Sequence, residues 1–182
     1  MHVKAPATLE DLARVPGKAE LVNGEIVHMP PTGDRPGVAG DEIYFSLRKH
    51  VESTGVGLAV SDNKAFRVNL PHRQSFSPDA AFYTGPRTGM KFFAEAPVFA
   101  AEVRSEGDYR PNAEQAMAAK RADYFAAGTK VVWDVDLLGE EIVRKFVAPA
   151  ADKPAAVFRR GEIADAGPAV PGWRMAVNDL FR

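Results

Sequence analysis

Cysteine is missing from all 182 residues, so the chain has neither disulfide bonds nor thiolate metal ligands. The sequence also lacks an apolar stretch long enough to span a membrane. No apolar run follows the basic residue near the N-terminus, so we expect no signal peptide. Together these absences predict a cytoplasmic protein.

A basic excess is also missing, since the formal net charge is -1. Proteins that wrap nucleic acid usually carry a strong positive charge. The balance weakens a nucleic-acid function without excluding one, because a bound metal ion brings its own positive charge. Local basic pairs such as His72–Arg73 and Arg159–Arg160 are each better interpreted as solvated surface.

The composition is that of an ordinary globular domain, with 46% hydrophobic and 26% charged residues. A chain of this length is typical of one domain, which we take to be residues 1–182. Its apolar content is sufficient for a sizeable core.

The N-terminal third predicts a short helix, a hairpin and a longer helix. Thr8 is a suitable N-cap for a short helix in LEDLARV, and Asn23-Gly24 lies between two alternating runs, as in a type I′ hairpin spanning residues 20–29. Apolar residues at i, i+4 and i+8 predict a helix over residues 41–53. Residues 30–40 are expected to be a loop because they are rich in proline and glycine.

Strands dominate the remainder of the chain. The expected strands cover residues 58–60, 65–69, 79–83, 98–104, 130–135, 141–147, 155–158 and 173–177, with a loop at 70–78 and a turn between the last two strands. The clearest helix covers residues 112–127, with Asn112 and Gln115 forming a start like a capping box and Gly128 at its C-terminal end. Its place between two buried strands predicts a βαβ crossover.

We therefore predict an α/β fold: a mixed central sheet flanked by helices, with an N-terminal β-hairpin and extra C-terminal strands. The strands at 79–83, 98–104 and 130–135 should be adjacent, and the helix at 112–127 should cover one face. The apolar faces of these elements predict a buried group consisting of Phe99, Val103, Met117, Val131 and Trp133.

Two carboxylates lie in strands that should be central. Side chains of a strand alternate between its faces, so Glu102 and Arg104 point the same way. A carboxylate in a central strand is costly unless it is paired or binds a metal. Glu102 therefore either forms a salt bridge with Arg104 or belongs to a site, and Asp79 is either a turn carboxylate after Pro78 or a member of that site.

Lys120 lies in the middle of an apolar stripe on the predicted helix. The stripe comprises Ala113, Ala116, Met117, Tyr124 and Ala127. A lysine in such a position either extends to the edge of the helix or meets a buried carboxylate. Because the helix should pack over the strand that carries Glu102, contact between Lys120 and Glu102 is geometrically reasonable.

Several segments, in order, resemble the Uma-two family of restriction endonucleases, part of the PD-(D/E)xK nuclease superfamily. The segments are ELVNGEIV, SPDAAF, EVRSEGD, KRADYFAAGTKVVWDVD and PGWRMAVNDLF. The resemblance extends from about Glu20 to Phe181. Each motif alone is weak, and their order and spacing make the resemblance specific.

The resemblance implies a role for each matching residue. Asp79 and Glu102 match the acidic residues that bind a divalent ion, Mg²⁺ or Mn²⁺, through oxygen. Arg104 occupies the usual lysine position but cannot act as a base, and Lys120 matches a lysine displaced onto the following helix. Glu25 matches a recurrent family acid, and Gln115 is a weaker candidate. A histidine associated with many members is missing after Met29.

The function implied is metal-dependent hydrolysis of phosphodiester bonds in DNA, with DNA as partner and a homodimer to cut both strands. The alternative is an inactive protein with a nuclease fold that serves as a binding or assembly module. The near-neutral charge and Arg104 favour this alternative, whereas the intact set of Asp79, Glu102 and Lys120 favours the enzyme. Hydrolysis of RNA or a nucleotide is a third possibility.

Overall fold

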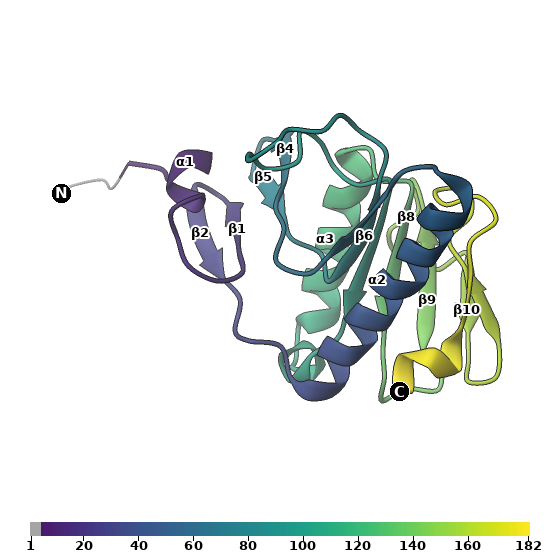
Figure 1. Cartoon of the computed structure of the whole chain (residues 1–182). Coiled ribbons are helices and arrows are strands. Elements are labelled where there is room, and N and C mark those ends of the chain that lie inside the picture. The colour runs from purple at the N-terminus through teal and green to yellow at the C-terminus, as the bar shows by residue number, and fades with distance from the viewer. Residues whose placement is uncertain (1–4) are drawn as a thin grey trace.

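The computed structural model describes residues 5–182 and has three layers, in which helices cover both faces of a central sheet (Figure 1). The helices are α1 (Leu9–Leu12), α2 (Asp34–Thr54), α3 (Ala113–Ala126) and the 3₁₀ helices η1 (Glu106–Tyr109) and η2 (Val177–Phe181). The strands are β1 (Ala19–Val22), β2 (Glu25–His28), β3 (Leu58–Ser61), β4 (Phe66–Leu70), β5 (Arg73–Phe76), β6 (Ala80–Tyr83), β7 (Phe99–Val103), β8 (Val131–Val135), β9 (Val143–Val147), β10 (Ala156–Phe158), β11 (Ile163–Asp165) and β12 (Arg174–Ala176).

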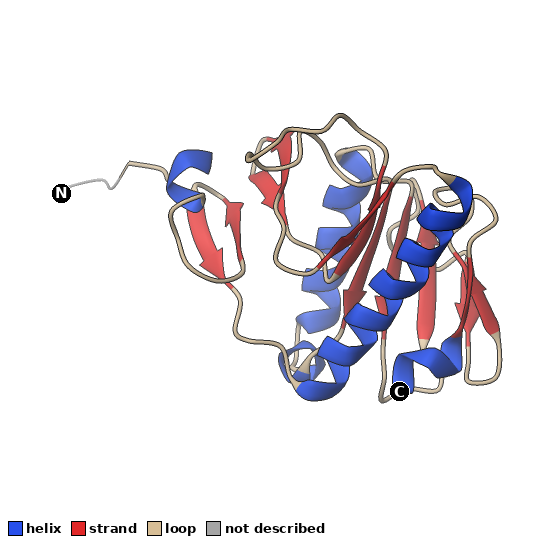
Figure 2. Cartoon of the chain, viewed as in Figure 1, coloured by secondary structure: helices blue, strands red, loops and turns tan. Residues whose placement is uncertain are grey.

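The central sheet has six strands in the order β10-β9-β8-β7-β6-β3. Strands β7 and β8 are parallel and are joined through α3, while the other neighbouring pairs are antiparallel. The predicted βαβ crossover and the adjacency of β6, β7 and β8 are therefore confirmed. A second sheet, β2-β1-β5-β4, joins the N-terminal hairpin to the body, and β11 pairs with β12 (Figure 2).

The N-terminal segment folds as local signals predict. The Thr8 side chain caps α1 in a capping box with Asp11. Asn23 and Gly24 both have positive φ angles, 52° and 71°, as a type I′ turn requires. The small apolar cluster of Leu12, Ala19 and Leu21 is closed by Phe92 from the loop before β7.

Two apolar clusters lie on opposite faces of the central sheet. On one face, Ile43 and Leu47 of α2 pack on Phe82 and Phe99, together with the C-terminal strands. On the other face, Tyr124 of α3 packs against β7 and β8. Four of the five residues predicted to be buried are so, namely Phe99, Val103, Val131 and Trp133.

Met117 is the exception, because it is only half-buried. The buried residues of α3 are Arg121 and Tyr124, so the face of α3 that meets the sheet is more polar than the apolar stripe predicted. Alanine occupies several of the remaining positions and contributes little to the periodic pattern.

The loop predicted at residues 30–40 is wrong from Asp34 onward. Helix α2 begins at Asp34, which places Pro36 in the first turn, where proline removes no intrahelical hydrogen bond. Gly40 is buried inside the helix, where its missing side chain allows close approach to Asp79.

The loop predicted at residues 70–78 is also wrong, because it contains β5. Strand β5 forms a hairpin with β4 and pairs with β1 through Val22 and Arg73. Strand β11 was likewise not predicted, because only a turn was expected between the last two predicted strands. Both are short strands whose partners decide their conformation.

The capping box predicted at Asn112 is absent from α3. Asn112 has φ 71° and its side chain makes no capping hydrogen bond. Asparagine tolerates this left-handed conformation, so the residue serves the turn before the helix instead. Gly128, with φ 104°, does end the helix region as predicted.

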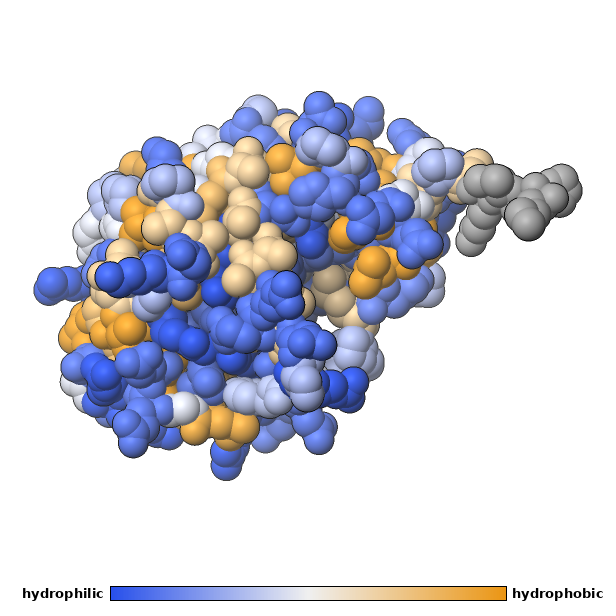
Figure 3. Space-filling model, turned by 180° about the vertical axis from the view of Figure 1, so that it is seen from behind, coloured by the Kyte–Doolittle hydropathy of each residue, from blue (hydrophilic) through white to orange (hydrophobic). Residues whose placement is uncertain are grey.

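Within residues 5–182, none of the helices combines the length and apolar character needed to cross a bilayer. Seen from behind, the surface is mainly hydrophilic, and its apolar patches are small and separate (Figure 3).

Candidate functional site

Asp79, which immediately precedes β6, lies beside Glu102 of β7. Ala80 is paired with Ala101 in antiparallel register, and the Asp79 N–H donates to the Ala101 carbonyl at 3.1 Å. The Val103 N–H donates to Asp79 Oδ2 at 2.7 Å, so Asp79 is bonded to both residues that flank Glu102 on β7. These bonds bring the two carboxylates into one region.

Lys120 reaches this region from α3. Its Nζ lies 2.9 Å from Glu102 Oε1 and 3.1 Å from Glu20 Oε1. The lysine thus meets a carboxylate, as its position on the helix suggested, and the alternative of an ammonium extended into solvent does not apply. Only 21% of its side chain is exposed.

Glu20 is a further acidic residue in contact with Lys120. Glu20, Asp79, Glu102 and Lys120 are called the cluster below. Glu20 lies on β1 with 4% of its side chain exposed, and its second oxygen accepts from Arg73 of β5. The Ser77 N–H also donates to Glu20 Oε1 at 2.9 Å. The N-terminal hairpin therefore contributes a buried carboxylate to a site otherwise made by β6, β7 and α3.

The charges in the cluster shift one another's pKa values. Burial alone would lower the pKa of Lys120, but Glu102 and Glu20 outweigh burial and raise it, so Lys120 is firmly protonated. Burial raises the pKa of Glu102, with Asp79 and Glu20 adding to the effect against Lys120. The pKa of Glu20 is lowered, because Lys120 and Arg73 together outweigh burial.

Tyr124 orients Glu102 from the next turn of α3. Its hydroxyl donates to Glu102 Oε1 at 2.6 Å, and its ring stacks on Phe76 at a centroid distance of 3.9 Å. Burial, followed by the nearby carboxylates, raises the pKa of Tyr124 well above its usual value, so the hydroxyl remains a donor. A cavity of about 110 Å³ borders Glu102, Lys120 and Tyr124.

Lys18 supplies a second ammonium group beside Asp79. Its Nζ lies 2.6 Å from Asp79 Oδ1 and 2.7 Å from Asp62 Oδ1. The other Asp79 oxygen accepts the Val103 N–H at 2.7 Å. Burial alone would lower the pKa of Lys18, but Asp79 and Glu102 raise it overall.

Arg104 faces the α3 side of the sheet but is engaged elsewhere. Its guanidinium forms a bidentate contact with Asp134 at 2.8 and 2.7 Å and also donates to Glu114. Arg121 binds the same Asp134 at 3.1 Å. Arg104 therefore ties β7 to β8 and α3, and the salt bridge with Glu102 considered above does not form.

Two secondary candidates do not join the cluster. Glu25 is exposed on β2, an edge strand, and Gln115 is exposed in the first turn of α3. Neither has a side-chain hydrogen bond or ion pair to the cluster within residues 5–182. Glu20 of the same hairpin does join it. The sequence signal for Glu20 is its place beside apolar residues in ELV. That position becomes significant because the strand is buried.

The donor set suits a hard cation with few protein ligands. Across residues 5–182 no group of three or more histidine, cysteine or acidic side chains has the geometry of a metal site. Mg²⁺ keeps several waters and often binds through one or two carboxylates, so Asp79 and Glu102 fit that mode. A closed site of four protein ligands, as in structural zinc centres, does not fit.

Comparison with known proteins identifies a matching family and a similar solved structure. The sequence model of the Uma2 family, described as "Putative restriction endonuclease", matches residues 7–178. No curated protein matches the sequence. A crystal structure described as "a putative nuclease belonging to DUF820", from Anabaena variabilis, is similar with a TM-score of 0.73 and 18% identity, covering 97% of this chain and 98% of that one. At this identity the likeness shows the fold, and it confirms the predicted α/β architecture with a mixed central sheet flanked by helices.

Proposed function

Because the chain belongs to the Uma2 family, we propose that it is a metal-dependent endonuclease that hydrolyses phosphodiester bonds of DNA. The family supports a nuclease. The metal requirement, the DNA substrate and the residue roles are parts of the proposal. One observation carries it: Asp79 is hydrogen-bonded to both residues that flank Glu102 on β7, and Lys120 lies 2.9 Å from Glu102.

In this proposal Asp79 and Glu102 hold Mg²⁺ or Mn²⁺. A bound divalent ion would supply an activated water and neutralise charge on the scissile phosphate. The oxygen-only chemistry of the two carboxylates and the hydrogen bonds between Asp79 and both neighbours of Glu102 support this assignment.

Lys120 is proposed to stabilise the negative charge that develops on the phosphate and to orient the attacking water. Its raised pKa makes it a fixed positive charge rather than a proton acceptor. Glu20 and Glu102 hold the ammonium in place, and Tyr124 fixes Glu102 through its hydroxyl hydrogen bond. Because these groups are held before substrate arrives, little reorganisation is needed during the reaction.

We further propose that residues 1–182 act as one domain and that a homodimer cuts duplex DNA. Cleavage of both strands needs two sites, and each chain offers one. The near-neutral net charge of -1 is consistent with local rather than extensive contact to the phosphate backbone.

The proposal predicts that Asp79→Ala and Glu102→Ala each abolish both metal binding and DNA cleavage. Mg²⁺ or Mn²⁺ binds the folded form, so the ion should raise the Tm of the parent protein and leave the Tm of these variants unchanged. Lys120→Ala should retain the metal-dependent rise in Tm and lose cleavage. The measurements are thermal unfolding with and without metal and a cleavage assay on duplex DNA, single-stranded DNA and RNA.

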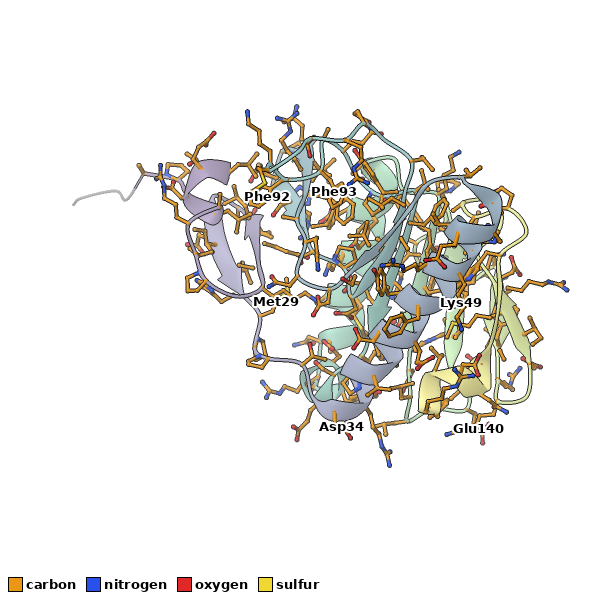
Figure 4. All side chains as sticks on the ribbon, viewed as in Figure 1. Met29, Asp34, Lys49, Phe92, Phe93 and Glu140 are labelled. Carbon is orange, nitrogen blue, oxygen red and sulfur yellow. The ribbon has the colours of Figure 1, made fainter. Side chains whose placement is uncertain are left out.

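Glu140→Ala is the matched control, because it removes an exposed carboxylate in the connection between β8 and β9 (Figure 4). This variant should behave like the parent in both assays. Cleavage that survives Asp79→Ala and Glu102→Ala would contradict the proposed site. A parent protein that binds metal and DNA but cuts no nucleic acid would instead favour the binding-module alternative.

A further inference from the structure

Lys18 lies where a cation is expected at Asp79. It precedes β1, in the segment that joins α1 to the hairpin, and 12% of its side chain is exposed. Its ammonium contacts Asp79 Oδ1 at 2.6 Å, while Asp79 Oδ2 is occupied by the Val103 N–H at 2.7 Å. The oxygen of Asp79 that remains open to a cation is therefore the one that Lys18 binds.

We infer that Lys18 is an internal counter-cation that a divalent ion must displace from Asp79, so that Lys18 sets the metal affinity of the site. This inference rests on the proposed function. A divalent ion bound to an Asp79 oxygen at about 2.0–2.6 Å and an ammonium on the same oxygen would be two cations within a few ångströms, which is strongly unfavourable away from bulk water.

The charge distribution explains why the metal-free site needs such a cation. Glu20, Asp62, Asp79 and Glu102 bring four negative charges into one neighbourhood. Lys120 is engaged with Glu20 and Glu102, and the structure gives it no contact with Asp79 within residues 5–182. Lys18 therefore neutralises the carboxylate that Lys120 does not reach.

The geometry also gives the Lys18 ammonium a second partner that it can keep after leaving Asp79. Its backbone is held, because the Lys18 carbonyl accepts from the Met29 N–H at 2.9 Å at the end of the β1–β2 hairpin. Its ammonium already contacts Asp62, whose side chain is 39% exposed, at 2.7 Å. A rotation of the side chain about this contact frees Asp79 while leaving the ammonium paired. Displacement then needs no movement of the hairpin.

Calorimetric titration with Mn²⁺ and Mg²⁺ tests the inference on the full chain. Lys18→Met keeps the length of the side chain and removes the charge, so it should bind Mn²⁺ roughly tenfold more tightly or better than the parent, given the size of short-range charge repulsion near a protein surface. Lys18→Arg retains the charge and should stay close to the parent. Lys49→Met removes an exposed lysine of α2 and should leave the affinity unchanged (Figure 4).

Thermal unfolding confirms that each variant is folded, and Lys18→Gln replaces Lys18→Met if the latter does not fold. The inference is supported if the uncharged Lys18 variant binds Mn²⁺ more tightly than the parent while Lys18→Arg and Lys49→Met do not. Binding of Mn²⁺ by parent and variant with equal affinity, or more weakly by the variant, overturns the inference and leaves the proposed metal site standing. Binding by neither protein overturns the proposed metal site and the inference together.

Discussion

Arg73 connects Glu20 to Asp123, which lies near the C-terminal end of α3. Its guanidinium contacts Glu20 on one side and Asp123 on the other, the latter at 2.9 Å. His72 contacts the second oxygen of Asp123 at 2.7 Å. The pKa of Arg73 is raised, because Glu20 and Asp123 together outweigh the effect of burial. Arg73 is thus a fixed charge that orients Glu20 toward Lys120.

Replacing Arg73 with methionine should therefore destabilise the fold strongly. Glu20 would lose a partner while remaining buried, and breaking one side of a buried ion pair typically costs about 3–5 kcal/mol. Urea unfolding at neutral pH measures the change in the free energy of unfolding. The variant should also lose cleavage activity through misplacement of Glu20 and Lys120.

Arg159→Met provides the control at the same scale. Arg159 pairs with Glu141 at 3.2 Å, but about half of each side chain is exposed. Exposed pairs contribute roughly 0–1 kcal/mol, so this variant should be close to the parent. Equal losses in the two variants would show that the buried pair of Arg73 and Glu20 contributes no more than an exposed pair.

At the scale of elements, the β11–β12 hairpin is fastened to the central sheet by Asp165. Asp165 Oδ1 accepts from Lys145 of β9 at 2.7 Å and from the Gly167 N–H at 2.8 Å. Its carbonyl accepts from the Trp133 indole at 3.1 Å. Burial alone would raise the pKa of Asp165, but Lys145 and the Gly167 N–H lower it below its usual 3.8.

This lowered pKa predicts a pH-dependent effect of Asp165→Asn. An acid whose pKa is lower in the folded state stabilises the fold above its unfolded pKa and loses that contribution as the pH falls through the folded value. At neutral pH the free energy of unfolding of the parent should exceed that of the variant by about 1 kcal/mol. The figure is modest because 38% of the Asp165 side chain is exposed. The difference should shrink as the pH falls below 3.8.

Free energies of unfolding measured in urea from neutral to acid pH check this expectation. Asp152→Asn, at an exposed position, should show no such trend. A difference between parent and Asp165→Asn that stays constant across the range would mean that the ion pair does not contribute as a charge pair.

At the scale of the whole molecule, cleavage of duplex DNA predicts a homodimer. Light scattering at working concentration should then give about twice the chain mass of 19.7 kDa. A mass equal to one chain, with duplex cleavage intact, would contradict the dimer and point to sequential nicking. Titration of DNA into the sample distinguishes a dimer formed in advance from one assembled on the substrate.

The sequence by itself determined the elements whose signals are local. The turn at Asn23-Gly24, the cap at Thr8 and the βαβ unit around α3 follow from turn chemistry, capping and periodicity over a few residues. The position of Lys120 on α3, above the strand that carries Glu102, follows from the same periodicity. Asp79 and Glu102 became candidates because a carboxylate in a strand predicted to be central needs a partner or a metal, and because the family resemblance gave both a role.

The tertiary structure alone decided which distant residues complete the site. Glu20 and Arg73 meet across 53 positions of sequence, and Lys18 and Asp79 across 61, so no local pattern reports either contact. The same applies to β5, whose strand conformation depends on pairing with β1 and β4, and to Arg104, whose partner Asp134 lies on the next strand. Local propensity fixes which segments become helices and strands. The choice of Glu20 over Glu25 required the packing of the hairpin against the body, because burial is a property of the assembled fold.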